Sequence, residues 1–280
     1  MTIIIDGRKI KDEMLLEIKR EVETLPFPPI FCDLLVGSDP SSVQYVKIKA
    51  RMAESVGIKF RTAEFPEATT EELRQEVENL NKVPHMCGII VQLPLPTTID
   101  KKIVLDQINP ELDVDCLGMI NSENFYHDEA TLYFPTALAC LQILDSLNLD
   151  LTNKEIIILG QGLLVGQPVA HLLRKRGLSV TTINSKTLEP EILIKRADVI
   201  ISAIGRAKYL KGEMLKEGVV LIDAGTSEDN GAVSGDVDLE SVLGVAAYVS
   251  PTPGGVGPVT VAMLLENVLQ VARRRLNKIT

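Results

Sequence analysis

Short apolar runs alternate along the chain with segments whose apolar residues recur every three to four positions. The apolar runs predict β-strands at residues 31–36, 58–65, 88–93, 155–159, 178–183, 199–203 and 219–223. The helical spacing predicts helices at residues 41–56, 70–81, 138–147, 169–176 and 261–277. Strands and helices in regular alternation are typical of α/β proteins whose sheets are mostly parallel.

Length divides this pattern into two domains. The chain has 280 residues, and a domain commonly has about 100–200 residues. A polar stretch at residues 148–153 follows a predicted helix and is the natural boundary. We therefore expect an N-terminal domain of residues 1–146 and a second domain of residues 147–260.

Residues 250–260 read Ser-Pro-Thr-Pro-Gly-Gly-Val-Gly-Pro-Val-Thr. Proline and glycine at this density do not propagate a helix or a sheet ladder, so the segment predicts a shaped loop. Because an apolar helical pattern follows from Val261, the loop would lead to a helix N-terminus whose backbone amides face a ligand. The alternative is an ordinary turn that is rich in glycine and proline.

A second glycine-rich segment begins at Gly160, directly after the predicted strand 155–159. Gly160 and Gly162 allow a tight turn and the close approach of a pyrophosphate, and Gly166 allows the next helix to pack on the strand. Strand, glycine turn, helix and strand together predict dinucleotide binding. The turns that follow the next two strands would line the same crevice, with candidate residues Gln161, Val165, Ala203, Gly205, Gly225 and Thr226.

The preferred dinucleotide depends on residues 184–187, which read Asn-Ser-Lys-Thr. An NAD site usually places a carboxylate about 20 residues after the glycine turn. Here Ser185 and Lys186 stand at that place, and they could pair with the 2′-phosphate of NADP. The alternative for Lys186 is an exposed loop lysine. The residues favour NADP over NAD.

Proton-transfer chemistry is suggested by Lys49, which lies four residues after Tyr45 on one face of a predicted helix. Partial burial would lower the pKa of such a lysine and suit it to proton transfer, whereas the alternative is a solvated lysine. Gln92 ends a buried strand before two prolines and could orient the amine. The alternative is a polar residue at a strand end with no special role. Asp113 and Asp115 could orient a ligand, bind a metal or lie on a surface loop, and few further metal ligands are present.

Composition excludes several classes of function. A net charge of −9 argues against general binding to nucleic acid or to an anionic membrane. No apolar run approaches the roughly 18 residues of a membrane span, and no secretory segment is visible. Four dispersed cysteines are typical of reduced thiols in a cytoplasmic protein. Three histidines without common spacing make a metal site or a histidine triad improbable.

Six motifs follow one another along the chain. They are Tyr45-Val-x-x-Lys49, Val91-Gln-Leu-Pro-Leu-Pro96, Asp113-Val-Asp115, Gly160 with Val165-Gly166-x-Pro168, Gly235-Asp-Val-Asp238, and Pro251-x-Pro-Gly-Gly-Val-Gly-Pro258-x-Thr260. Together they resemble one family, the bifunctional methylenetetrahydrofolate dehydrogenase/cyclohydrolases, over roughly residues 3–270. The resemblance implies a three-layer α/β/α catalytic domain, to which the terminal helix 261–280 returns, and a Rossmann-type domain that binds NAD(P). It also implies one cleft between the two domains and a homodimer joined through the Rossmann domains.

The same resemblance implies roles for particular residues. Lys49 would transfer the proton in hydrolysis, Gln92 would tune it, Tyr45 would stack near the pterin, and Asp115 would hold the pterin nitrogens. The loop of residues 251–258 would close over folate and nicotinamide. The remaining candidates are Leu93, Pro94, Pro253, Gly254 and Gly255 for the folate and Thr260 for the dinucleotide.

Three departures from the family pattern bear on function. Cys116 stands where the family has glycine, and a positive φ there would cost on the order of 1–2 kcal/mol. Residues 134–139 read Phe-Pro-Thr-Ala-Leu-Ala in place of Pro-Cys-Thr-Pro-x-Gly, and Gln161 replaces an arginine that holds the NADP phosphate. The last change leaves NAD possible. The alternatives are a variant with only one activity, a non-catalytic paralogue, and another two-domain oxidoreductase of the shikimate dehydrogenase type.

Overall fold

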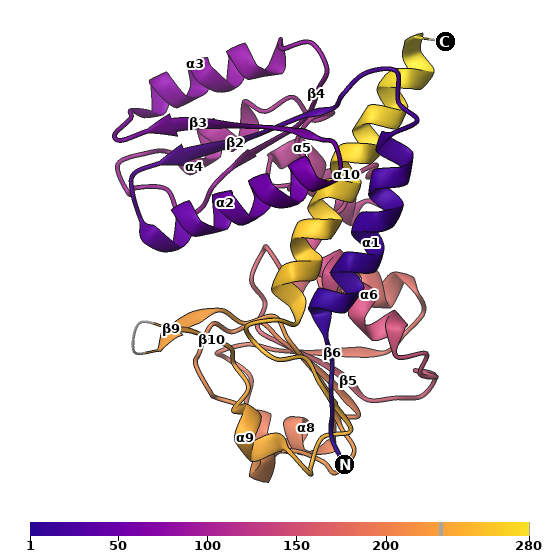
Figure 1. Cartoon of the computed structure of the whole chain (residues 1–280). Coiled ribbons are helices and arrows are strands. Elements are labelled where there is room, and N and C mark those ends of the chain that lie inside the picture. The colour runs from indigo at the N-terminus through magenta and orange to yellow at the C-terminus, as the bar shows by residue number, and fades with distance from the viewer. Residues whose placement is uncertain (230–231, 280) are drawn as a thin grey trace. The chain divides into compact units, whose positions relative to one another are not determined.

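The computed structural model describes residues 1–229 and 232–279, which form two compact units (Figure 1). The three-stranded unit comprises Glu13–Pro135 and Val261–Thr280. The six-stranded unit comprises Met1–Asp12 and Thr136–Thr260. Each unit has its own parallel sheet.

The three-stranded unit is built on the sheet order β3-β2-β4, with β2 at Ile30–Val36, β3 at Lys59–Phe65 and β4 at Met86–Val91. The crossover helices α2 (Pro40–Ser55) and α3 (Thr70–Asn81) lie on opposite faces of this sheet (Figure 1). All residues of β2 and β4 are buried, as expected for strands of a parallel sheet that is covered on both faces. The remaining short helices are α4 (Lys101–Asp106) and α5 (Met119–Tyr126).

The six-stranded unit has the sheet order β1-β11-β8-β7-β5-β6. The bounds of these strands are Ile3–Ile4 (β1), Ile156–Leu159 (β5), Val180–Ile183 (β6), Val199–Ser202 (β7), Val220–Asp223 (β8) and Tyr248–Val249 (β11). The helices are α6 (Pro135–Ser146), α7 (Gly166–Lys175), α8 (Pro190–Arg196) and α9 (Leu239–Val242), with a 3-10 turn at Gly212–Met214. Two further strands, β9 (Ser227–Asp229) and β10 (Ala232–Ser234), pair with each other in a separate antiparallel sheet. Strand β5 lies between β7 and β6, so the chain order reverses beside it. In sheets of this kind ligands bind at the carboxyl ends of the strands next to such a reversal.

The α/β fold class, the parallel sheets and the two-part organisation are confirmed. Several predicted boundaries differ by one to three residues, and the largest error is at helix α10 (Val256–Ile279), which begins five residues before the expected Val261. It includes Pro258, its third residue. Proline is tolerated there because the N–H groups of the first turn have no partner inside the helix.

The division by contacts also differs from the predicted boundaries at two places. Residues 1–12 and 136–146 group with the six-stranded unit rather than with residues 13–135. Residues 1–12 group with the six-stranded unit because their strand β1 pairs with β11, with Ile3 opposite Tyr248 and Ile4 opposite Val249. A two-residue edge strand gives too short an apolar pattern to be recognised in the sequence. Helices α1 (Gly7–Val22), α6 and α10 each contain a division point.

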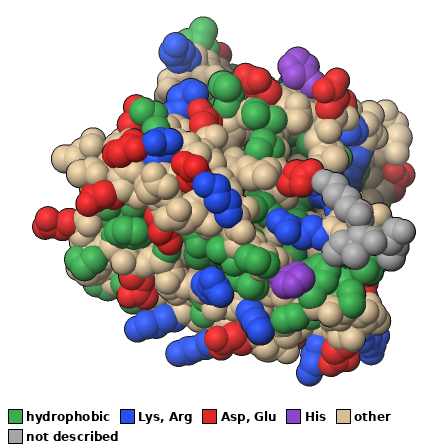
Figure 2. Space-filling model, turned by 90° about the horizontal axis from the view of Figure 1, so that it is seen from above, with side chains coloured by type: hydrophobic (Ala, Val, Ile, Leu, Met, Phe, Trp, Pro, Cys, Tyr) green, Lys and Arg blue, Asp and Glu red, His purple; other side chains and the backbone are tan. Residues whose placement is uncertain are grey.

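Surface charge is mixed. On the face drawn in Figure 2, Lys and Arg side chains lie among Asp and Glu side chains. No helix in residues 1–229 or 232–279 has the length and apolar character needed to cross a bilayer.

Candidate active site

Lys49 is buried, with 2 % of its surface exposed. It lies on helix α2, whose N-terminus is fixed by Asp39, since the Asp39 carboxylate accepts a hydrogen bond of 2.8 Å from the backbone N–H of Ser42. The buried stripe of α2 contains Ser42, Val46, Lys49 and Ala53. Helical spacing thus directs the lysine toward the sheet together with its apolar neighbours, and the solvated-lysine alternative does not apply.

Three groups surround the Lys49 ammonium. Nζ donates a hydrogen bond of 2.7 Å to Oε1 of Gln92. It forms an ion pair with Asp33, whose Oδ2 lies 2.5 Å from Nζ. It also lies 5.0 Å from the centroid of the Tyr45 ring, within the range of a cation–π contact. We call Asp33, Tyr45, Lys49 and Gln92 the lysine cluster.

Gln92 is oriented by the end of strand β4. Its backbone N–H continues the ladder to the carbonyl of Leu34 at 2.9 Å. Its side-chain Nε2 donates to the carbonyl of Leu93 at 2.7 Å, which leaves Oε1 directed at Lys49. Strand β4 ends at Val91, and Pro94 has no N–H with which to continue the pairing. Leu93 is half-buried and Pro94 is exposed beside the cluster.

Asp33 is the residue of this cluster that the sequence analysis missed. It lies in the middle of strand β2 with no exposed surface. Burial raises the pKa of its carboxyl to about 6, while the charge of Lys49 acts in the opposite direction. A signal was present in the sequence, because Asp33 is the one charged residue in an apolar strand.

Asp115 lies near the lysine cluster, because its charge acts on both Asp33 and Tyr45. Burial raises the pKa of the Asp115 carboxyl, and the positive charge of Lys49 partly opposes this effect. Burial is also the main cause that raises the pKa of the Tyr45 hydroxyl, with Asp115 and Asp33 adding to it. An ionised Asp115 beside a protonated lysine would present both signs of charge to a polar ligand.

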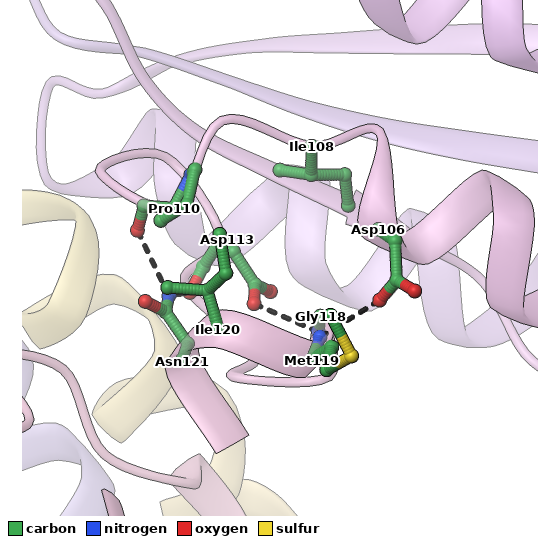
Figure 3. A pocket seen from close by; sticks show the side chains of 8 residues that line it. All are labelled: Asp106, Ile108, Pro110, Asp113, Gly118, Met119, Ile120 and Asn121. Atoms are coloured by element: carbon green, nitrogen blue, oxygen red, sulfur yellow. Dashed lines mark hydrogen bonds between the residues drawn. The ribbon is translucent and has the colours of Figure 1, made fainter. Parts of the chain in front are cut away.

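Asp113 has a different role from Asp115, although only Val114 separates them. Asp113 is buried and accepts hydrogen bonds from the backbone N–H groups of Leu117 at 3.2 Å and Gly118 at 2.9 Å. It lines a small pocket with Asp106, Ile108, Pro110, Met119, Ile120 and Asn121 (Figure 3). Burial raises the pKa of the Asp113 carboxyl to about 6. Asp113 therefore fixes the loop that carries Asp115, and in the described part of the chain no three His, Cys, Asp or Glu residues gather as a metal site would need.

Asn267 of helix α10 is a second residue that the sequence analysis missed. It is fully buried, and its Nδ2 donates to the carbonyl of Val114 and to that of Tyr133, both at 2.8 Å. These bonds hold the backbone immediately before Asp115. The signal in the sequence is an amide residue on the apolar stripe of a helix, a place where a polar group needs a partner.

Cys116 stands where the family has glycine, and its backbone does have a positive φ. Cys116 has φ of +59° and is fully buried. A residue with a Cβ is strained in this conformation, whereas glycine is not. The other departure begins at Phe134, which is buried and packs edge-on against Phe125 with ring centroids 4.9 Å apart.

The glycine turn of the six-stranded unit has the geometry of a dinucleotide cradle. Gly160 has φ of +97°, and a Cβ there would lie 2.4 Å from the carbonyl oxygen of Ala203. At Gly166 a Cβ would lie 2.0 Å from the carbonyl oxygen of Gly160. At Gly162 a Cβ would meet nothing within 4 Å, so the turn is open there. Helix α7 begins at Gly166, after Val165, without a side-chain cap.

The other candidates for dinucleotide binding follow the carboxyl ends of neighbouring strands. Leu159 of β5 is in register with Ile183 of β6 and with Ser202 of β7. The turn after β6 exposes Ser185 and Lys186, and its Asn184 side chain accepts from the Lys186 N–H at 2.8 Å. The glycine turn, this basic turn and Ala203 therefore lie along one edge of the sheet.

Two buried carboxylates tie the turns after β7 and β8 together. Asp236 accepts from the Ser202 hydroxyl at 2.7 Å and from the N–H of Ile204 at 2.8 Å. Asp223 accepts from the N–H of Gly225 and of Asp236, both at 3.0 Å. Burial raises the pKa of the Asp223 carboxyl to about 7. The candidates Gly205 (φ +65°), Gly225 and Thr226 stand on these turns.

The loop of residues 250–255 does lead to a helix N-terminus, that of α10. Gly255 closes the loop by donating its N–H to the carbonyl of Pro251 at 2.7 Å. Gly254 has φ of +109°, and Pro253 precedes it. Thr260 lies inside helix α10 rather than in the loop, and its hydroxyl donates to the Val256 carbonyl at 3.2 Å.

Comparisons with known proteins agree over the whole chain. Residues 5–115 match the catalytic domain of tetrahydrofolate dehydrogenase/cyclohydrolase, and residues 135–276 match the NAD(P)-binding domain of the same family. The bifunctional protein FolD of Halothermothrix orenii is 40 % identical over 276 residues, which is 96 % of this chain and 98 % of that protein.

Solved structures give the same result. The bifunctional FolD dehydrogenase/cyclohydrolase of Campylobacter jejuni is 34 % identical with a TM-score of 0.93, covering 98 % of this chain and 100 % of that one. The Trypanosoma brucei enzyme, complexed with NADP cofactor and inhibitor, is 33 % identical with a TM-score of 0.92 and 98 % coverage of both chains. The chain therefore belongs to the tetrahydrofolate dehydrogenase/cyclohydrolase family.

Proposed function

We propose that this protein oxidises 5,10-methylenetetrahydrofolate to the 5,10-methenyl form with NAD(P) and hydrolyses the methenyl form to 10-formyltetrahydrofolate. Membership of the family supports both activities. The observation that carries the proposal is the hydrogen bond of 2.7 Å from the buried Lys49 to Gln92. A lysine held at a fixed atom, away from solvent, is suited to move a proton in hydrolysis.

In the hydrolytic step, water forms a bond to the methenyl carbon and gives up one proton to the Lys49 amine. The resulting adduct then opens by breaking the bond between that carbon and N5 of the pterin, with the hydroxyl proton ending on N5. Gln92 holds the amine in place through its oxygen. Asp115 would accept hydrogen bonds from the amino and ring nitrogens of the pterin, and Tyr45 would lie against the pterin face. Leu93 and Pro94 of the same unit would add further folate contacts.

The glycine turn fits a dinucleotide. Gly160 and Gly166 lie against backbone where a Cβ would collide, and Gly162 faces open space. The backbone of Gly160–Gly162, with Val165 and Gly166, would hold the pyrophosphate, and Ala203, Gly205, Gly225, Thr226 and Thr260 would lie along the rest of the site. When bound, the nicotinamide supplies the hydride acceptor for the oxidation.

We propose NADP rather than NAD as the preferred dinucleotide. Ser185 and Lys186 are exposed at the carboxyl end of β6, where they are free of the carboxylate that usually holds the ribose hydroxyls in NAD sites. A lysine and a hydroxyl there can bind a 2′-phosphate by charge-assisted hydrogen bonds. We further propose a cytoplasmic homodimer joined through the six-stranded units, as the resemblance implies.

Steady-state kinetics of the purified chain test the proposal. We expect methenyl formation from methylenetetrahydrofolate with NADP at a higher kcat/KM than with NAD, and separate hydrolysis of added methenyltetrahydrofolate. Oxidation without hydrolysis would mean that the protein is a dehydrogenase only. Absence of both activities, with folate still bound, would make it a non-catalytic paralogue.

A further inference from the structure

Among the described residues, Asp33 is the carboxylate in direct contact with the Lys49 ammonium, while Asp115 acts on it through its charge. The contacts of the ammonium are the Gln92 amide oxygen, the Tyr45 ring face and Asp33 Oδ2. An amide oxygen does not take up a proton near neutral pH, and neither does a ring face. Since Lys49 is 2 % exposed, water has little access to it. The Asp33 carboxylate is therefore the group placed to receive its proton.

The surroundings of Asp33 suit this role. No hydrogen-bond donor within residues 1–229 and 232–279 reaches Asp33 Oδ1, so Lys49 at Oδ2 is the partner that stabilises the ionised carboxylate. The titratable groups that act on it are Lys49 and Tyr45 from α2, Asp115 from the loop before α5, and Cys32 beside it on β2. Asp33 and Asp115 bring two negative charges to one ammonium, which favours an extra proton on a carboxyl group. In agreement, the pKa of Asp33 is raised to about 6.

We propose, building on the hydrolytic function above, that Asp33 is a positioning residue that holds Lys49 and takes its proton to release the free amine for catalysis. The resting pair is an ammonium and a carboxylate. Transfer of one proton from Nζ to Asp33 gives a neutral amine and a neutral acid, so the net charge of the buried pair does not change. The amine then takes a proton from the attacking water and becomes ammonium again. Asp33 gives up its proton before the next cycle, and this is the one proton that hydrolysis of the methenyl cation releases.

The test compares Asp33→Asn with the wild type in both reactions over a range of pH. Asparagine keeps the shape of the side chain but does not accept the proton. We expect hydrolysis by Asp33→Asn to fall at least about tenfold, in the range of lost acid–base assistance, with the dehydrogenase kcat nearly unchanged. The wild-type rate of hydrolysis should fall as pH drops through about 6, because protonated Asp33 no longer takes the Lys49 proton, and this fall should be absent from the variant.

Asp12→Asn is the control for the loss of an aspartate. Asp12 is exposed on helix α1, and its ion pair of 2.7 Å is with Lys11 rather than with a residue of the lysine cluster. That variant should keep the wild-type pH profile of hydrolysis. If Asp33→Asn does not fold, the wild-type profile remains decisive, and a hydrolysis rate that is flat between pH 5 and 7 overturns the inference.

Other outcomes separate this inference from the proposed function. Equal losses of both activities in Asp33→Asn, an unchanged pH profile, or faster hydrolysis than in the wild type would each overturn the role of Asp33. A wild type without any hydrolysis would instead refute the proposed cyclohydrolase activity and, with it, this inference.

Discussion

The lysine cluster of the three-stranded unit and the glycine turn of the six-stranded unit differ in what their residues contribute. The cluster contributes charged side chains, whereas the turn contributes backbone. In the cluster, Lys49 and Asp33 are buried side chains whose charges act on each other. In the turn, Gly160 and Gly166 contribute only backbone, and any side chain there would collide with a carbonyl oxygen. The first region can thus be changed chemically without moving the backbone. At Gly160 and Gly166, the second can be changed only by deforming the backbone.

The largest effect is expected from Lys49→Met, which removes the amine from the lysine cluster. We expect hydrolysis to fall by about 10²–10⁴-fold, the range for loss of a positioned acid–base group, because nothing else in the cluster replaces Nζ. The dehydrogenase activity should persist, since methionine keeps the apolar stem of the side chain. Separate assays of methenyl hydrolysis and methenyl formation measure the two effects.

Lys47→Met is the control for this variant, because Lys47 is an exposed residue of the same helix. It should leave both rates at wild-type values. Retention of hydrolysis in Lys49→Met would remove this residue from the mechanism.

The glycine turn is tested by Gly166→Ala and Gly162→Ala. The Cβ at residue 166 would lie 2.0 Å from the Gly160 carbonyl oxygen, whereas at residue 162 it meets nothing within 4 Å. Gly166→Ala should therefore destabilise the fold by about 1–3 kcal/mol, the usual cost of overpacking, and weaken NADP binding. Gly162→Ala should leave the thermal unfolding midpoint almost unchanged but still weaken NADP binding, because the new methyl group occupies the open space.

Thermal unfolding and a nucleotide titration separate the two effects. If Gly162→Ala binds NADP as the wild type does, the pyrophosphate does not approach this residue. If Gly166→Ala is as stable as the wild type, the contact with Gly160 does not constrain the turn.

The same comparison explains what could be predicted from the sequence. Most strands and helices followed from apolar spacing, and Lys49, Gln92 and Asp115 were chosen as candidates because each stands in a short motif. Asp33 was missed because its partner is 16 positions away in the chain, on the other side of a strand–helix connection. Asn267 was missed for a similar reason, since its acceptors Val114 and Tyr133 are distant in sequence. Local patterns report the element that carries a residue, but they do not report which buried partner it meets.

A smaller change tests selectivity for the dinucleotide. In the glycine turn, Gln161 donates from Nε2 to the Gly160 carbonyl at 2.6 Å. Gln161→Arg would add a permanent positive charge beside the proposed phosphate site, and it should raise the ratio of NADP to NAD kcat/KM by about tenfold, the effect of a charge-assisted hydrogen bond. Gln161→Met, which is similar in length but uncharged, should not raise that ratio. An unchanged ratio in Gln161→Arg would indicate that the 2′-phosphate is bound by other residues, such as Lys186, or is not bound.

The smallest expected effect concerns Cys116 of the three-stranded unit. As at Gly160 of the glycine turn, its backbone has a positive φ that favours glycine. Cys116 has φ of +59° and no exposed surface. Glycine relieves the strain of positive φ but loses the buried thiol, so Cys116→Gly alone would mix two opposing effects. Cys116→Ala also loses the thiol but keeps the strained Cβ. Cys116→Gly should therefore be more stable than Cys116→Ala by about 1 kcal/mol, measured by denaturant unfolding. Equal stability, or a more stable alanine variant, would mean that the surrounding hydrogen bonds accommodate a Cβ at this position without strain, and that the loop before α5 does not depend on the backbone freedom of glycine.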